Sequence, residues 1–285
     1  MIPQPVTDGG PTIISLGDVK FTYDGGVEAL KGVTLNIKKG EYVAVVGGNG
    51  SGKTTLAKQM NGLLRPGGGT VTIGGRPAAP QTVAELSRVV GYVFQNPDHQ
   101  LFSPSVEEEV LFGPENIGYS GPDSRNKAEH AMALMGIGHL RKEPPLSLNL
   151  GARRKVTIAS VLAMSPQVLV LDEPTTGLDD QESRDLMAGI DGLNKQGLTV
   201  ILITHEMKIV AEHANRVVVM AEGRIVLDSD VKGAFADIEL LRQSKLVPPP
   251  ITLLAHRLSA YGISRDVLST DEFVFEASKM IGGSR

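Results

Sequence analysis

The chain has 285 residues with 28 basic and 32 acidic side chains, a net charge of -4, and neither Cys nor Trp. Hydrophobic residues make up 41% of it, which is enough to fill a core and excludes a disordered chain. The slight acidity gives no electrostatic attraction to nucleic acid or to an anionic membrane surface. Without Cys there can be no disulfide framework, thiol nucleophile or Cys-ligated zinc.

Neither a secretory signal nor a membrane span is predicted. Residues 1–11 lack a basic start and an apolar core. The longest apolar stretches, such as residues 217–220, are far too short to cross a bilayer. We expect a soluble chain that a partner would bring to any membrane at which it works.

Short apolar segments along the chain are typical of strands. These predicted strands cover residues 33–37, 42–46, 70–73, 168–171 and 199–203. Helices are predicted over residues 53–63 and 181–195, and residues 97–163 are mainly helical with breaks at Pro and Gly. Near-continuous apolar strands separated by helices are typical of a parallel sheet that is covered on both faces. The predicted fold class is therefore α/β.

Three parts are expected along the chain. Residues 1–12 form a flexible leader, residues 13–235 form the main domain with a helical subdomain at about 97–163, and residues 236–285 form a short C-terminal extension. The extension has balanced charge and no motif of its own. We expect it to be a packing or dimerisation element.

Residues 47–54, Gly-Gly-Asn-Gly-Ser-Gly-Lys-Thr, match the phosphate-loop pattern Gly-x4-Gly-Lys-Ser/Thr. Glycines let consecutive N–H groups point at one phosphate, and the N-terminus of the following helix adds positive potential. Lys53 would contact the β- and γ-phosphates, and the Thr54 hydroxyl would ligate Mg²⁺. A flexible glycine turn would not explain the strand before the loop and the helix after it. The predicted nucleotide-binding residues are Gly47, Gly48, Asn49, Gly50, Ser51, Gly52, Lys53, Thr54 and Thr55.

The strand at residues 168–171 ends in two carboxylates, Asp172 and Glu173. By itself, this pattern is typical of an ordinary strand that enters a solvated loop. Beside a phosphate loop the metal-site interpretation is favoured, because Mg²⁺ there needs a carboxylate at the carboxyl edge of the sheet. Asp172 would hold the metal through water, and Glu173 is placed to take a proton from an attacking water. His205 follows another strand at the same kind of edge, although a lone His is more often structural.

Taken together, these motifs resemble the ATPase subunit of an ABC transporter, over nearly the whole chain from about residue 13. The resemblance implies the P-loop ABC ATPase fold, with ATP and Mg²⁺ bound. It also implies that Tyr23 stacks on adenine. The residues around Tyr23, taken alone, are equally compatible with a core or a surface aromatic. Gln95 would sense Mg²⁺ and the attacking water and couple the site to the membrane partner.

The same resemblance assigns three catalytic or contact roles. Glu173 matches the catalytic base, and His205 matches the switch residue at the γ-phosphate. Asp179, in Gly-Leu-Asp at residues 177–179, lies in the loop that contacts the partner ATPase. A P-loop kinase or GTPase is rejected because it lacks these motifs in this order.

A narrower match is to the energy-coupling-factor (ECF) branch, which imports vitamins or transition-metal ions such as cobalt and nickel. It lies in residues 95–102, 106–114 and 250–258. The branch implies two ATPases beneath a membrane T component, with a substrate-binding S component beside it. This chain would then be peripheral, at the cytoplasmic face of the cell membrane.

The T component's coupling helices carry Arg and dock near Gln95 in this branch. Asp98, Glu107, Glu108 and Glu109 are therefore candidate partners for those arginines. A solvated helix face, favoured by the helix dipole, explains the Glu run equally well.

The family signature, Leu-Ser-Gly-Gly-Gln, is altered here. Residues 148–152, which we call the signature segment, read Leu-Asn-Leu-Gly-Ala. The amide of Asn149 could still donate to the partner's γ-phosphate, Leu150 lacks the backbone freedom of Gly, and Gly151 is kept. We hypothesise that the chain pairs with a second, homologous but non-identical ATPase. Each ATP site would then combine one subunit's phosphate loop with the other's signature segment, and only one of the two sites would carry the altered segment. A homodimer, in which both sites are altered, stays open.

Two alternative functions remain. A conventional ABC importer ATPase differs only in the ECF-like segments. A soluble, non-transport ABC ATPase usually carries a coiled-coil insertion or two ATPase domains in one chain, and this sequence shows neither. The acidic balance also gives no indication of a nucleic-acid partner.

Overall fold

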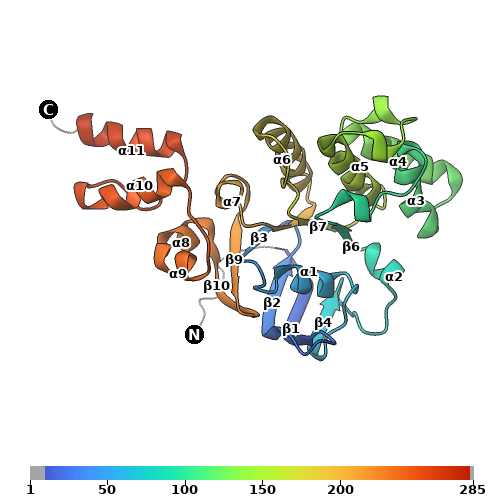
Figure 1. Cartoon of the computed structure of the whole chain (residues 1–285), viewed down its shortest axis with the longest axis horizontal. Helices are drawn as coiled ribbons and strands as arrows, with labels where there is room; N and C mark the ends of the chain where they lie inside the picture. The colour runs from blue at the N-terminus through green and yellow to red at the C-terminus, as the bar shows by residue number, and fades with distance from the viewer. Residues whose placement is uncertain (1–9, 283–285) are drawn as a thin grey trace.

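The computed structural model describes residues 10–282, so residues 1–9 of the expected leader lie outside the described part. Its strands form two sheets (Figure 1). The first is antiparallel, in the order β2 (Glu28–Lys38), β1 (Thr12–Thr22), β4 (Gly68–Ile73) and β5 (Arg76–Pro77). The second runs β10 (Arg224–Asp230), β9 (Arg216–Ala221), β3 (Tyr42–Val46), β8 (Thr199–Ile203), β7 (Val168–Asp172) and β6 (Val90–Val93).

The second sheet is parallel from β9 to β6, and only β10 runs antiparallel to its neighbour. Alternate residues of β3 face opposite cores: Val43 and Val45 pack with the antiparallel sheet, whereas Ala44 packs with helices on the other face. Because both faces are covered, the strand must be apolar at every position. The predicted α/β fold with a parallel sheet covered on both faces is confirmed.

Helices surround this sheet in three groups (Figure 1). Helix α1 (Lys53–Met60) lies between the two sheets, and short α2 (Val83–Ser87) precedes β6. The helical region predicted at residues 97–163 holds α3 (Val106–Asn116), α4 (Gly121–Leu134) and α5 (Leu150–Leu162), with single turns at Pro97–His99, Gly138–Leu140 and Pro145–Ser147. The others that pack on the sheet are α6 (Asp180–Lys195), α7 (Met207–His213), α8 (Val231–Ala236) and α9 (Ile238–Gln243).

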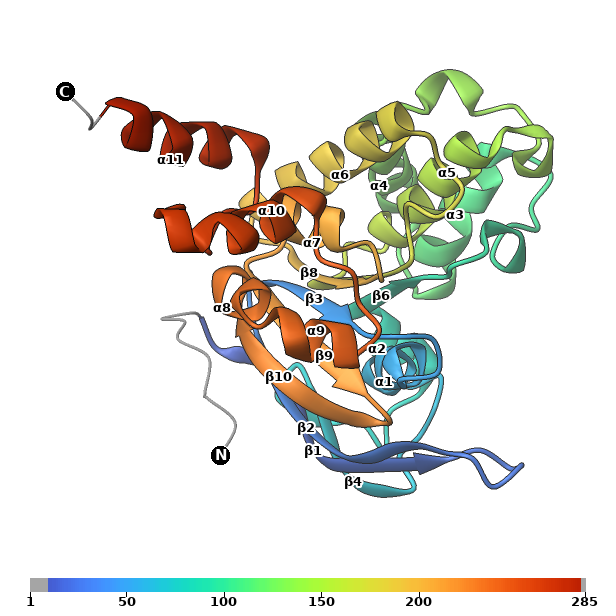
Figure 2. The same cartoon turned by 60° about the vertical axis from the view of Figure 1, so that its left-hand side comes forward.

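The C-terminal helices α10 (Pro250–Leu258) and α11 (Thr270–Gly282) form a separate pair (Figures 1 and 2). They lie on the opposite side of the sheets from α3–α5. A small apolar cluster of their own, centred on Ala255, Ile263 and Val267, joins them. Within residues 10–282, no helix is both long and apolar enough to cross a membrane.

Helix α1 is shorter than the predicted 53–63. It ends at Met60, since Gly62 adopts a left-handed conformation with φ of 75°. Such a residue after the last turn is a common helix stop. Strands β1 and β9 were not predicted as strands, because their sequences were interpreted only as an aromatic motif and an apolar stretch.

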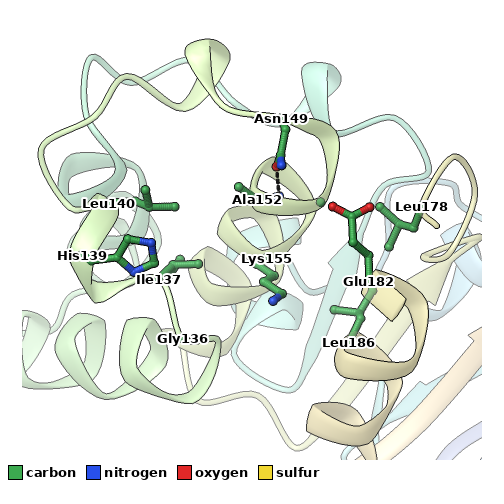
Figure 3. Close-up of a pocket in the computed structure, with 11 residues that line it drawn as sticks. Gly136, Ile137, His139, Leu140, Asn149, Ala152, Lys155, Leu178, Glu182 and Leu186 are labelled. Atoms are coloured by element: carbon green, nitrogen blue, oxygen red, sulfur yellow. Dashed lines mark hydrogen bonds between the residues drawn. The ribbon is translucent and has the colours of Figure 1, made fainter. Parts of the chain in front are cut away.

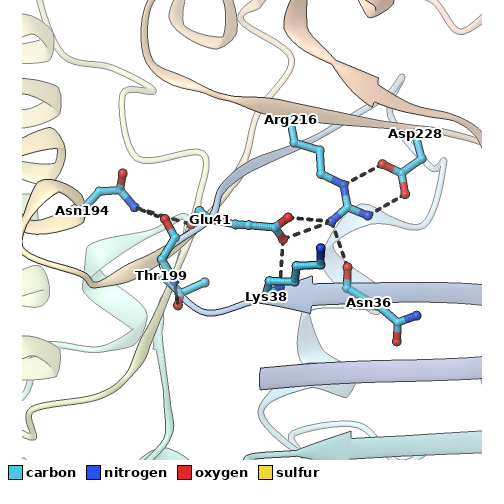
Figure 4. A network of polar contacts seen from close by, with 8 residues as sticks. Asn36, Lys38, Glu41, Asn194, Thr199, Arg216 and Asp228 are labelled. Carbon is cyan, nitrogen blue, oxygen red and sulfur yellow. Dashed lines mark hydrogen bonds and ion pairs between the residues drawn. The ribbon is translucent and has the colours of Figure 1, made fainter. Parts of the chain in front are cut away.

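A buried arginine, Arg216, forms hydrogen bonds with residues of both sheets (Figure 4). Arg216 of β9 is only 4% exposed, and its Nε and Nη2 donate to the two oxygens of Asp228 on β10 at 2.7 Å each. Its Nη1 donates to the carboxylate of Glu41 at 3.0 Å and to the carbonyl of Asn36 on β2 at 2.9 Å. Burial by itself lowers the pKa of Arg216, but the hydrogen bonds and charges of Asp228 and Glu41 raise it above its usual value.

We predict that Arg216→Ala costs about 3–5 kcal/mol of unfolding free energy, because the buried carboxylate of Glu41 and the half-buried carboxylate of Asp228 lose the guanidinium that binds both. Urea denaturation of the full chain measures this value. Arg76→Ala, which removes an exposed arginine from β5, is the control and should change the unfolding free energy by less than about 0.5 kcal/mol. Equal losses from both variants would contradict a special role for Arg216.

Candidate nucleotide-binding and catalytic site

One edge of the parallel sheet gathers the predicted site residues. The phosphate loop follows β3, Gln95 follows β6, Asp172 ends β7, and His205 follows β8. Because these strands are parallel, their carboxyl ends share one edge, where ligands bind in open α/β sheets. Residues from four distant parts of the sequence are thereby brought around one opening.

The phosphate loop requires glycine at its two ends for steric reasons. At Gly47, with φ of 152°, a Cβ would lie 2.2 Å from the carbonyl of Met220. At Gly52, with φ of 104°, a Cβ would lie 2.6 Å from the carbonyl of Ala29. Helix α1 then begins without a side-chain cap and without an acidic residue in its first turn. Its first N–H groups are therefore available to an anion.

Lys53 supplies a buried cation at this loop. Its ammonium donates to the carbonyls of Gly47 at 2.7 Å and Gly48 at 3.1 Å, and the residue is 8% exposed. Burial lowers the pKa of Lys53, while the charges of Glu173 and Asp172 act in the opposite direction. Loop amides and a confined ammonium are what a polyphosphate needs.

Asp172 faces the loop with both carboxylate oxygens hydrogen-bonded. Oδ1 accepts from the Thr54 hydroxyl at 3.4 Å, and Oδ2 accepts from the Tyr92 hydroxyl at 2.7 Å. Burial and the charge of Asp172 raise the pKa of Tyr92 well above its usual value, so the phenol stays a donor. Tyr92 was missed as a site residue, although it lies three positions before Gln95 on a strand of this edge. Hydroxyl and carboxylate oxygens together suit Mg²⁺.

Glu173 and His205 form a close pair. The Nδ1 atom of His205 lies 2.8 Å from Oε1 of Glu173, and the Thr204 hydroxyl donates to Oε2 at 3.2 Å. Glu173 itself is strained, with φ of 48°, and its N–H donates to the carbonyl of Ile203 on β8 at 2.8 Å. Glu173 is 7% exposed, whereas the His205 side chain is 59% exposed. The carboxylate is thus fixed, and the imidazole is open to a second contact.

Gln95 is exposed at the cleft and is held through its backbone. The guanidinium Nη1 of Arg154, on α5, donates to the carbonyls of Gln95 at 2.6 Å and Phe94 at 3.0 Å. Arg154 is 1% exposed, and burial lowers its pKa, with the charge of Asp172 opposing that effect. No role in the site was predicted for Arg154 from the sequence. A buried guanidinium that binds two carbonyls of one loop acts as a positioning group.

A cleft of about 720 Å³, within the size range of ligand pockets, opens at this edge of the sheet, and the predicted residues Gly47, Gly48 and His205 do not line it. Tyr23 lies at it, 41% exposed, with its hydroxyl 3.0 Å from that of Thr55. The other lining residues that had been predicted are Asn49, Gly50, Ser51, Gly52, Lys53, Thr54, Thr55, Gln95, Asp172 and Glu173. Those that sequence analysis missed are Val27, Glu28, Ala29, Lys31, Glu222 and Gly223, which carry no motif.

Comparison with known proteins agrees with this arrangement. Residues 30–176 match the family model of the ABC transporter. The chain belongs to the ABC transporter family. It is 42% identical, over 91% of its length and 94% of the relative's, to the energy-coupling factor transporter ATP-binding protein of Methanoculleus marisnigri. By this family membership the chain binds ATP and is an ATPase of the ECF type.

Other relatives are longer or have known structures. An ABC transporter ATP-binding protein of Caldanaerobacter subterraneus is 42% identical over 93% of this chain, but the chain spans only 46% of that relative. The structure of CbiO1 from Clostridium perfringens, part of the CbiONQ transporter complex, has a TM-score of 0.74 and 37% identity, covering 88% of this chain and 98% of CbiO1. A bacterial ABC transporter cassette solved as a dimer has a TM-score of 0.70 and 29% identity, covering 78% of this chain and all of the cassette.

The signature segment lies away from this ATP cleft. Asn149 caps α5, with its side-chain oxygen accepting from the N–H of Ala152 at 2.8 Å. Its amide NH₂ is left as a donor. Asn149 and Gly151 line a smaller pocket of about 210 Å³ between α5 and α6, which shares no residue with the ATP cleft (Figure 3). Within one copy of the chain, the signature segment and the phosphate loop therefore line different pockets.

The segment packs on the dimer loop, residues 177–179, of the same chain. A Cβ at Gly177, which has φ of 82°, would lie 2.7 Å from Cδ2 of Leu150. A Cβ at Gly151 would lie 2.5 Å from Oε1 of Glu182, whose other oxygen accepts from the Asp179 N–H at 3.3 Å. Asp179 caps α6 and is exposed. The altered Leu150 thus fits against a glycine, and the two segments form one surface.

The acidic residues proposed for docking are already engaged within the chain. Asp98 pairs with Arg153 at 2.9 Å, and Glu107 pairs with Arg141 at 2.5 Å. Glu109 is 3% exposed and accepts from the backbone N–H groups of Phe102 and Ser103. Glu108 contacts the hydroxyl of Ser105, the cap of α3. These contacts favour a structural role for three of the four acids, Asp98, Glu107 and Glu109.

We predict that Arg154→Lys lowers turnover about tenfold but changes ATP affinity less than twofold, because the shorter lysine side chain would not place its ammonium where Nη1 binds both carbonyls. Phosphate release and equilibrium nucleotide binding, measured separately, check this split. Arg125→Lys, an exposed substitution on α4, is the control and should leave both values unchanged. A parallel loss of affinity and turnover would show that Arg154 serves general stability instead.

Proposed function

We propose that this chain is the ATP-hydrolysing subunit that energises an ECF-type importer of a vitamin or a transition-metal ion such as cobalt or nickel. One observation carries the proposal: phosphate-loop residues and two carboxylates line the cleft, His205 contacts one of these carboxylates, and the signature segment lines a different pocket. Such a site would be completed only by the signature segment of a second ATPase subunit. The ECF-type relatives favour this importer over a conventional one.

The cleft residues then have defined roles. Lys53 and the loop amides bind the phosphates, and Tyr23 stacks on adenine. Glu173 orients the attacking water and accepts its proton, because its carboxylate is fixed by Thr204 and His205. The exposed imidazole nitrogen of His205 contacts the γ-phosphate and keeps the base in line. Catalysis is then mainly positioning and charge stabilisation, as is general for phosphoryl transfer.

Thr54, Asp172 and Gln95 would hold Mg²⁺. Their hydroxyl, carboxylate and amide oxygens face the cleft beside the phosphate loop, and Thr54 and Asp172 are already within 3.4 Å of each other. When bound, the ion neutralises charge on the β- and γ-phosphates. Tyr92 orients the Asp172 carboxylate from behind.

Two such subunits would close head to tail, each nucleotide lying between one phosphate loop and the partner's signature segment. Asn149, with Leu150 and Gly151, would contact the partner's ATP, and Asp179 would contact the partner subunit. The altered segment favours a non-identical partner. Movement of Gln95 on closure would pass to a membrane T component with an S component beside it, placing the chain at the cytoplasmic membrane face.

We predict that Glu173→Gln keeps ATP affinity within about twofold but lowers turnover at least roughly a hundredfold, the usual contribution of a general base. Nucleotide binding and phosphate release on the same preparation measure the two effects. Glu212→Gln, an exposed change on α7, should retain full turnover. Normal turnover in Glu173→Gln would remove Glu173 from the base role.

The requirement for partners is tested by isolation from the native host. Tagged Glu173→Gln chain, solubilised in detergent with ATP, should bring down a second ATPase and polytopic membrane proteins, the smaller of which identifies the substrate class. If only cytosolic proteins or the chain itself are recovered, the ECF importer proposal fails. Robust dimerisation and turnover of the wild-type chain alone with ATP would show that a non-identical partner is not needed.

A further inference from the structure

The phosphate loop makes a contact that its nucleotide chemistry does not explain. The N–H of Gly48 donates to the carbonyl of Ser244, in the turn that follows α9, at 3.0 Å. The carbonyl of the same residue accepts from the Lys53 ammonium. Gly48 is therefore held from both sides, by the catalytic lysine and by a segment almost 200 residues later in the chain.

The turn after α9 is itself firmly built. Lys245 is left-handed, with φ of 60°, and the N–H groups of Ser244, Lys245 and Leu246 all donate back to α9 at 2.9 Å. Leu241 and Leu246 are 0% and 2% exposed and belong to the same core as Val46, the last residue of β3. This turn therefore cannot shift without disturbing the core beneath the phosphate loop.

The contact is also tight. A Cβ at Gly48 would lie 3.1 Å from Cβ of Lys245, 3.2 Å from its Cδ and 3.3 Å from the Ser244 carbonyl. A second cavity, of about 390 Å³, lies between the loop and this turn and shares Lys31, Asn49, Gly50, Ser51 and Glu222 with the ATP cleft. The turn that leads towards α10 thus shares a cavity with residues of the phosphate loop.

We propose that Ser244 and Lys245 are positioning residues of the phosphate loop, and that the C-terminal extension responds to ATP through them. Only four residues separate Lys245 from α10, and of these Pro248 and Pro249 are buried with fixed φ, so a displacement of the turn reaches α10. The inference rests on ATP binding by the chain, not on the partners proposed above.

A double-mutant cycle tests the contact. We expect Gly48→Ala to weaken ATP binding about tenfold, because the added Cβ crowds Lys245. The double variant Gly48→Ala/Lys245→Gly should recover most of that loss, because glycine removes both close carbons of Lys245 and suits the left-handed turn. Binding of a fluorescent ATP analogue to the purified full chain gives the affinities, and thermal unfolding checks each fold. Lys232→Asn, which removes an exposed lysine on α8 away from the phosphate loop, is the control and should bind normally.

Two results would overturn the inference. One is additive behaviour, in which the double variant binds no better than Gly48→Ala, since the effect would then belong to the loop alone. The other would come from hydrogen exchange of the wild-type chain. We expect ATP with Mg²⁺ to slow amide exchange in residues 241–258, relative to the exchange of residues 121–134 of α4. Protection of the phosphate loop without any change in residues 241–258 would show that the extension does not respond. Both experiments need no membrane partner, so they succeed or fail independently of the importer proposal.

Discussion

The parallel pairing of β3 with β8, and of β8 with β7, is the constraint on which the ATP site depends. It sets the phosphate loop, Asp172 and His205 at the same height along one sheet edge. The contacts of Thr54 with Asp172 and of His205 with Glu173 are possible only in that register. A shift of one residue would turn each side chain to the opposite face of the sheet. The packing on both faces opposes such a shift, because side chains of a different size would then enter each close-packed core.

The strain at Glu173 follows from the same constraint. The chain leaves β7 through a left-handed residue whose N–H is still bound to β8, so the carboxylate is directed at the cleft instead of into solvent. Strain of this kind costs free energy and persists only where neighbouring contacts determine it, which here are Thr204 and His205. The sheet therefore supplies rigidity to the base, while the exposed Gln95 and His205 are left free to respond to a nucleotide and a partner.

Much of this was predictable from local sequence patterns. Residues 42–46 are apolar at every position and residues 199–203 at every position except Thr199, so both strands were predicted with the bounds observed. The phosphate loop was predictable because its residue types carry its chemistry. Tyr92 and Arg154 were missed because their roles come from tertiary contacts with Asp172 and Gln95, which no spacing reveals. The acids of α3 looked like a surface for a basic partner, yet the fold uses Glu109 as an acceptor for a neighbouring loop and Glu107 as the partner of Arg141.

The altered signature segment is understandable once its surroundings are known. Leucine at position 150 would be costly against a bulky neighbour, but it lies over Gly177, and Gly151 leaves room for Glu182. Glu182 in turn binds the backbone of Asp179, so a change in the signature segment is transmitted to the dimer loop of the same chain. The two segments that would meet a partner's nucleotide and a partner's surface are therefore not independent. A partner that accommodates Leu150 must accommodate the dimer loop in the position that Leu150 sets, and this joint requirement is a physical basis for selecting one particular ATPase over another.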